Sequence, residues 1–189
     1  MAVSPAPVTS PLTPALILGI DGVIVPLRTT APYYTWKDWS LVPLHPNAFL
    51  SQAMADALAH LSPQRVWLTR RYELARNLET VLGWPSLPIL APAPIELPYW
   101  NSWLKLKSLA AYTQNHPQQP IIWFEDDPRL ITEGNRFVRE HRLNALLIHT
   151  NKIHGISPED LNIANRWLTR LAQNIELAKL ESLSDSDLL

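Results

Sequence analysis

The chain contains no cysteine. Disulfide bonds, thiolate metal sites and cysteine-based catalysis are therefore excluded, which fits a reducing compartment. Neither sign of charge is in excess, because the sequence has 16 basic residues and 17 acidic ones. This balance creates no overall field that would attract nucleic acid or an anionic membrane, so an anionic ligand would have to be held by a local site.

Long apolar runs are also missing from the chain. No window approaches the roughly 18 apolar residues that are needed to span a bilayer. The N-terminal stretch has no basic segment, and its apolar positions are interrupted by Pro5, Pro7, Pro11 and Pro14, which argues against a signal peptide. We therefore expect a cytoplasmic protein with neither a membrane nor a nucleic-acid partner.

Apolar residues make up 47% of the 189 positions, which is enough for one substantial core. We expect a single domain over residues 15–180, preceded by a flexible proline-rich arm at residues 1–14 and followed by an acidic tail at residues 181–189. No internal repeat is visible in the sequence. One folding unit is the simplest organisation.

Short apolar runs alternate with longer helical patterns, as in βαβ units around a mainly parallel sheet. The expected strands are residues 15–20, 65–69, 87–90, 121–124 and 145–148, and the expected helices are residues 47–61, 72–82, 103–112, 128–141 and about 158–180. Asn47 is the expected cap of the first helix, and Gly83 is the expected end of the second. Residues 26–46 are rich in aromatic side chains and lack a helical period, so a β-hairpin or flap is predicted there.

The carboxyl ends of parallel strands meet at one edge of a sheet, where ligands usually bind. The polar segments expected at this edge are 19–22, 68–71, the region of Lys105, and 125–127. Together they supply a carboxylate, a hydroxyl, a lysine and an acidic cluster, a combination that can hold Mg²⁺ and a phosphate group.

These segments, in this order, resemble the motifs of the haloacid-dehalogenase-like (HAD) superfamily over about residues 15–170. Family members open with D-x-D-G-[VT]-[LI], and the matching stretch here is Gly19-Ile20-Asp21-Gly22-Val23-Ile24. The second motif ends a strand in serine or threonine and is matched by Thr69. The resemblance implies a Rossmannoid three-layer α/β/α fold, with a mainly parallel central sheet and a small hairpin flap after the first strand.

The remaining motifs complete the resemblance. A lysine near a helix start is matched by Lys105, with Lys107 as its rival, and an acidic pair after an apolar strand is matched by Glu125-Asp126-Asp127. In the family, the acidic motif binds Mg²⁺ together with the backbone carbonyl of the second aspartate of the first motif. By resemblance, that carbonyl belongs here to Asp21, whose side chain takes the place of the general acid and base.

The first motif departs from the family pattern. The first aspartate of the family attacks phosphorus, but Gly19 stands in its place and has no side chain. The covalent route is therefore closed. Glu125 stands in the place of an aspartate and is one methylene longer, so we expect Mg²⁺ binding to be weakened.

Two pairs of residues are candidates for ligand contacts. Arg70 and Arg71 follow the strand that carries Thr69, where a guanidinium can grip a phosphate group. Trp36 and Trp39 lie in the predicted flap and are candidates for a ligand lid or for a protein interface. Packing is the expected role of the tryptophans at Trp67, Trp123 and Trp167.

Plainer interpretations of the same residues stand beside these. Asp21-Gly22 is also a turn sequence, and Asp126-Asp127-Pro128 is also a common helix start. Arg70 and Arg71 also fit a solvated pair at a helix start. His149 and His154 lack the neighbouring ligands of a zinc site, so we expect them to be solvated loop residues.

Three functions follow from the sequence. The leading hypothesis is a pseudoenzyme or phosphoryl-ligand-binding module with weakened Mg²⁺ binding. The second is a Mg²⁺-dependent phosphate-ester hydrolase in which Asp21 and the acidic trio Glu125-Asp126-Asp127 act without a covalent intermediate. The third is a protein-interaction module that uses the aromatic flap.

Overall fold

The computed structural model describes residues 13–28, 30–32, 34–44, 46–90 and 102–186. Its strands are β1 (Ala15–Leu18), β2 (Ser40–Val42), β3 (Ala48–Leu50), β4 (Arg65–Trp67), β5 (Ile121–Glu125) and β6 (Ala145–His149). Its helices are α1 (Gln52–Leu61), α2 (Tyr72–Leu82), α3 (Ser102–Asn115), α4 (Pro128–Glu140) and α5 (Pro158–Ser186). A four-stranded parallel sheet has the order β4-β1-β5-β6, and β2 and β3 form a separate antiparallel pair. The predicted α/β class is confirmed.

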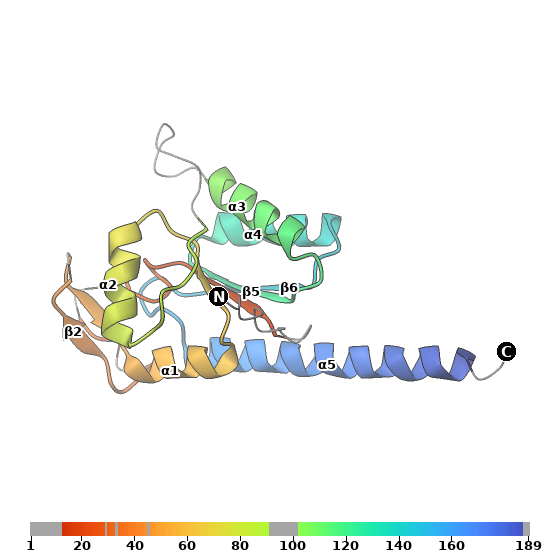
Figure 1. The fold of residues 1–189 in the computed structure, drawn as a ribbon. Helices are drawn as coiled ribbons and strands as arrows, with labels where there is room; N and C mark the ends of the chain where they lie inside the picture. Colours follow the sequence, from red (N-terminus) through yellow and green to blue (C-terminus); the bar gives the residue numbers. More distant parts are fainter. Residues whose placement is uncertain (1–12, 29, 33, 45, 91–101, 187–189) are drawn as a thin grey trace, which may run out of the picture.

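Helices cover both faces of the sheet (Figure 1). α3 and α4 lie over one face, and α1 and α5 lie over the other. Successive side chains of a strand point to opposite faces, so Leu16 and Leu18 of β1 pack in one core cluster, whereas Ile17 packs in the other. Because both faces are covered, every residue of β1 is buried and apolar. This three-layer arrangement is compatible with a Rossmann-like fold.

The hairpin lies later in the chain than the predicted flap. β2 falls inside residues 26–46, but its partner β3 occupies the positions where the first helix was expected to begin. Asn47 is therefore not a helix cap, and that prediction was wrong. α1 begins at Gln52 instead, where the Ser51 hydroxyl accepts a hydrogen bond from the Met54 N–H at 3.0 Å.

Other boundaries differ less. α2 ends as predicted at Gly83, which has the left-handed φ of 65° that glycine adopts readily. Residues 87–90 form no strand, and Ile89 makes only a single parallel bridge to Trp67. α5 continues to Ser186, so the first part of the predicted acidic tail is helical. Of the predicted arm, residues 1–12 lie outside the described residues.

Over the part of the chain that the structure describes, no helix combines the length and the apolar character needed to cross a membrane.

Candidate functional site

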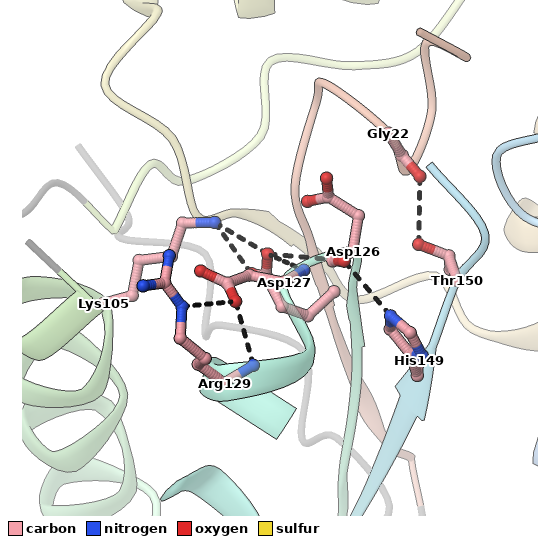
Figure 2. A network of polar contacts seen from close by, with 8 residues as sticks. Gly22, Lys105, Asp126, Asp127, Arg129, His149 and Thr150 are labelled. Atoms are coloured by element: carbon pink, nitrogen blue, oxygen red, sulfur yellow. Dashed lines mark hydrogen bonds and ion pairs between the residues drawn. The ribbon is translucent and has the colours of Figure 1, made fainter. Parts of the chain in front are cut away.

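The predicted polar segments meet at the carboxyl ends of three neighbouring strands. Gly19 and Asp21 follow β1, Thr69 follows β4, and Glu125 is the last residue of β5. Lys105 comes from α3 and extends toward the end of β5 (Figure 2). These residues therefore belong to one site, although they lie more than a hundred positions apart in the sequence.

An ion pair between a buried glutamate and a partly exposed lysine lies at the centre of this site, and the Lys105 side chain is 31% exposed. The Glu125 side chain is 1% exposed, and Lys105 Nζ lies 3.0 Å from its Oε1 and 2.7 Å from its Oε2. The backbone N–H groups of Asp126 and Asp127 also donate to Oε1, at 3.2 and 3.3 Å. Lys107, the rival lysine, is exposed on the same helix. The structure thus selects Lys105 as the lysine of the site.

A second ion pair connects two of the other segments. Arg71 Nη1 donates to Asp21 Oδ1 at 2.6 Å, with side chains that are 28% and 38% exposed. The Arg71 backbone N–H donates to the Thr69 hydroxyl at 3.1 Å, and Thr69 itself is buried. Arg71 therefore contacts the acid/base candidate and is not free to bind a ligand without leaving it. Arg70 Nη2 is buried and has no hydrogen-bond partner in the part of the chain that the structure describes.

Among the three carboxylates of the acidic trio, Asp126 is the one whose negative charge is least offset by its surroundings. Burial, a hydrogen bond with the Glu125 carboxylate and the negative charge of Glu125 raise the pKa of Asp126 to about 6, and the charge of Lys105 offsets part of this rise. The carboxyl group lies against Gly22, whose φ is 70°, and a Cβ at that position would come within 2.5 Å of Asp126 Oδ2. Position 22 therefore requires glycine for two reasons: its φ is positive, and the Asp126 side chain leaves no room for a Cβ.

Asp126→Asn is expected to stabilise the protein in a pH-dependent way. Below about pH 4 the carboxyl is protonated in both the folded and unfolded states and the variant gains nothing, whereas above about pH 6 the folded state carries an unfavourable charge that asparagine removes. The gain should grow across that interval and level off at about 1–2 kcal/mol, after allowance for solvent screening. Denaturant unfolding at several pH values measures it, and a gain that is the same at acidic and neutral pH would contradict the assignment.

Asp127 has a structural role. It is the N-cap of α4, and its Oδ1 accepts a hydrogen bond from the Arg129 N–H at 2.9 Å and lies 3.5 Å from Arg129 Nε (Figure 2). Asp127 is half-buried and Arg129 is largely exposed. The plain interpretation of this residue as part of a helix start is confirmed.

Two residues of the site were not anticipated. The buried Thr150 hydroxyl donates to the Gly22 carbonyl at 3.0 Å, and its backbone N–H donates to the Glu125 carbonyl at 2.9 Å. His149 Nε2 lies 3.1 Å from the Asp126 carbonyl, which accepts its hydrogen bond (Figure 2). Both residues lie at the carboxyl end of β6, so the rule that selected the other segments would have found them.

Three of the four carboxylates at this site are engaged by donors of the protein. Within the described ranges, no group of three or more histidine, aspartate or glutamate side chains is placed to hold a metal ion. Glu125 is bound by Lys105, Asp21 is bound by Arg71, and Asp127 caps a helix. Each of these carboxylates accepts at least one hydrogen bond from a donor of the protein, which competes with Mg²⁺ for its oxygen ligands.

Gly19 has an ordinary backbone conformation, because its φ is not among the positive values of the chain. A Cβ built at this position would lie 3.0 Å from Val23 Cγ2 and 4.0 Å from the Phe124 carbonyl oxygen. A larger residue is therefore opposed by one methyl group and not by the backbone. Any aspartate placed here needs Val23 to shift or to be shortened.

The two tryptophans of the predicted lid are engaged by the protein itself. Trp39 is 6% exposed and packs in the core, and its Nε1 donates to the Thr35 hydroxyl at 3.1 Å. Trp36 is partly buried against the same core, and its Nε1 donates to the Ile156 carbonyl at 2.8 Å. The lid assignment is therefore corrected for Trp39, and the same burial removes the basis for a protein interface through its ring. Packing of Trp67 and Trp123, both fully buried, is confirmed.

Comparisons with protein-family models, curated proteins and solved structures give no match to this chain. The structure establishes the class of protein, which is an α/β fold with a four-stranded parallel sheet. A polar, internally neutralised site lies at the carboxyl ends of its strands. The resemblance to the HAD superfamily remains a prediction from the motifs.

Proposed function

We propose that this chain is a HAD-like pseudoenzyme of the cytoplasm, which binds a small phosphorylated ligand without covalent phosphoryl transfer. One observation carries the proposal: the position of the nucleophile is occupied by Gly19, in a site where Glu125 is paired with Lys105 and Asp21 is paired with Arg71. An enzyme that attacks phosphorus needs a free nucleophile and an activated base. Here the side chains are arranged to neutralise one another.

The two arginines after β4 are the proposed ligand contacts. Arg70 has a buried Nη2 without a partner among the described residues, so a movement of this side chain toward a phosphate group would satisfy the donor. The pair of Arg71 with Asp21 is partly exposed, and such pairs contribute little to stability. A phosphate group, which accepts bidentate hydrogen bonds from guanidinium, can therefore draw Arg71 away at small cost.

A hydrolase that works without a covalent intermediate is the second candidate. The observation that favours it is Asp126, because a carboxyl with a pKa of about 6 is suited to general acid and base catalysis near neutral pH. The pairing of Asp21 argues against this candidate. Asp21 would have to act as the base, but its Oδ1 already accepts the short hydrogen bond from Arg71.

The test is hydrolysis of para-nitrophenyl phosphate with and without Mg²⁺, together with binding of inorganic phosphate by calorimetry. We expect no turnover above buffer and saturable phosphate binding that falls about tenfold in Arg70→Gln. Arg136→Gln, which changes an exposed arginine of α4, is the matched control and should leave binding unchanged.

Two variants decide between the candidates. Gly19→Asp combined with Val23→Ala restores the missing carboxylate without the close methyl contact, and Val23→Ala alone is its control. Turnover that appears only in the combined variant would show a site disabled at one position. Turnover by the unaltered chain that is lost in Asp21→Asn would refute the pseudoenzyme and support the hydrolase.

A further inference from the structure

The last helix, α5, is longer than the body of the protein against which it packs. It has 29 residues and spans about 43 Å at the rise of an α-helix. Its first half lies beside α1, whereas its second half projects beyond the sheet and the other helices (Figure 1). In this second half, the side chain of Leu177 is 58% exposed. Because most of the stability of a helix comes from packing of its apolar side, the projecting half is a candidate for contact with another molecule.

One apolar stripe runs along α5 from the body into the projecting half. Its members are separated by alternating steps of three and four positions, and they are Leu161, Ala164, Leu168, Leu171 and Ile175. Leu161 and Ala164 are buried in the core, but Leu168, Leu171 and Ile175 are only partly buried. Steps of three and four are the spacing at which two helices pack along a common seam. The stripe therefore fits a second helix.

Exposed side chains gather just before the start of α5, where the segment between β1 and β2 meets the loop after β6. The Leu27 N–H donates to the Lys152 carbonyl at 2.7 Å. The Tyr34 ring packs edge-on against His154, with ring centres 4.4 Å apart. Leu27, Tyr34 and Ile153 are 49%, 63% and 42% exposed. We call the surface formed by Leu27, Arg28, Tyr34, Lys152, Ile153 and His154 the loop patch.

The loop patch carries positive charge that no described carboxylate neutralises. Arg28 donates to two neutral hydroxyl groups, from Nη1 to Tyr34 at 2.9 Å and from Nη2 to Thr30 at 3.1 Å. These hydrogen bonds hold the guanidinium group at the surface without cancelling its charge. Among the described residues, no ion pair includes Arg28 or Lys152. Two cations beside apolar side chains favour a partner segment that is both acidic and apolar.

The acidic tail of this chain has the complementary composition. Residues 181–189 contain no basic residue, three leucines and the three acidic residues Glu181, Asp185 and Asp187. The tail is remote from the loop patch of its own chain, because α5 begins at Pro158, shortly after the patch, and its length separates the two. In a second copy whose α5 runs antiparallel to the first, the same length brings each tail beside the start of the other α5.

We propose that two copies of this chain form a dimer with twofold symmetry, in which the α5 helices pack antiparallel and the acidic tail of each copy binds the loop patch of the other. The apolar stripe supplies the contact between the helices, and the tail supplies carboxylates for Arg28 and Lys152. Each contact occurs twice, and the assembly closes because both tails and both patches are used. No residue of the loop patch belongs to the strand-end site, so the inference does not depend on the proposed function.

The first test is analytical ultracentrifugation of the full chain over a range of concentrations, in which we expect a reversible dimer. Lys152→Glu places like charges together and should weaken the dimer at least about tenfold. Asp185→Lys combined with Asp187→Lys should have the same effect. In an equimolar mixture of these two variants, each patch meets a tail of opposite charge, so the affinity of the unaltered chain should return. Arg136→Glu, a charge reversal on the exposed surface of α4, is the matched control and should leave the dimer unchanged.

The absence of cysteine allows a second test by cross-linking. Lys152→Cys combined with Ser184→Cys should give a covalent dimer with a short bismaleimide, whereas Arg136→Cys combined with Ser184→Cys should not. A chain that is monomeric at every concentration would overturn the inference. It would also be overturned by a dimer that tolerates Lys152→Glu, by a mixture that does not regain affinity, or by equal cross-linking of the two cysteine pairs.

Discussion

Lys105→Met is expected to lower the free energy of unfolding by about 2–4 kcal/mol. The reason is the Glu125 carboxylate, which is 1% exposed and would remain in the interior after its cation is removed. Removing the cation is costly because the buried charge then keeps only the hydrogen bonds from the Asp126 and Asp127 backbone N–H groups. Urea unfolding at neutral pH measures the change.

Lys107→Met is the control, because this lysine is exposed on the same helix and its loss should change stability by less than about 0.5 kcal/mol. Adding Glu125→Gln to Lys105→Met removes the stranded charge and should recover most of the loss. If Lys105→Met costs no more than Lys107→Met, the Lys105–Glu125 pair does not stabilise the site and the site is not internally neutralised as we describe.

Glu79→Ala should have a comparable effect, a loss of about 2–4 kcal/mol in the free energy of unfolding. The Glu79 side chain is 6% exposed. Its Oε1 accepts hydrogen bonds from Trp67 Nε1 at 2.9 Å, from the Leu87 N–H at 2.9 Å and from Arg76 Nη1 at 2.8 Å. Alanine would leave the Trp67 and Leu87 donors unsatisfied between α2, β4 and the segment that follows α2, whereas Arg76 Nη1 keeps its hydrogen bonds to the Ser86 hydroxyl and the Leu87 carbonyl. Glu140→Ala, on the exposed face of α4, is the matched control and should have little effect.

The loss in Glu79→Ala should also depend on pH. Burial raises the pKa of Glu79, but the hydrogen bonds from Arg76, Leu87 and Trp67 outweigh it, and the net pKa is lowered from 4.5. A carboxylate with a lowered pKa in the folded state contributes stability above its unfolded pKa and loses it as the pH falls through the folded value. The difference between the variant and the unaltered chain should therefore shrink in acid. A difference that persists unchanged well below pH 4 would assign the loss to packing alone.

Two features could be predicted from the sequence for a simple reason. They are the buried strands of the parallel sheet and the edge of that sheet where the site lies. β1 and β5 are covered on both faces, so all of β1 and the first four positions of β5 are apolar, and these runs are visible without knowing the partner strands. The site then followed from the direction of parallel strands, because polar residues directly after such runs must meet. α2 and its end at Gly83 were also predictable, since apolar spacing and a terminal glycine are local signals.

The features that were missed depend on partners far along the chain. The start of α1 is fixed by Ser51 and by Asp38, whose carboxylate accepts hydrogen bonds from the Ser51 hydroxyl at 2.6 Å and the Ala53 N–H at 2.8 Å. Asn47 has the right chemistry for a cap, but the strand pairing of β3 takes precedence over it. Arg65 and Glu79 look like ordinary charged residues in the sequence, and only the packing of neighbouring segments buries them.

The loop after β1 makes several hydrogen bonds to residues from the last third of the chain. The Val23 carbonyl accepts a hydrogen bond from the Ile156 N–H at 2.9 Å, and the Gly22 carbonyl accepts one from the Thr150 hydroxyl, across a sequence separation of 128 residues. Contacts of such long range form only after large loops have closed, so they form late in folding. During synthesis, the segment with Gly19 and Asp21 leaves the ribosome long before its partners are made. The segment of the candidate site that is synthesised first therefore reaches its final geometry last.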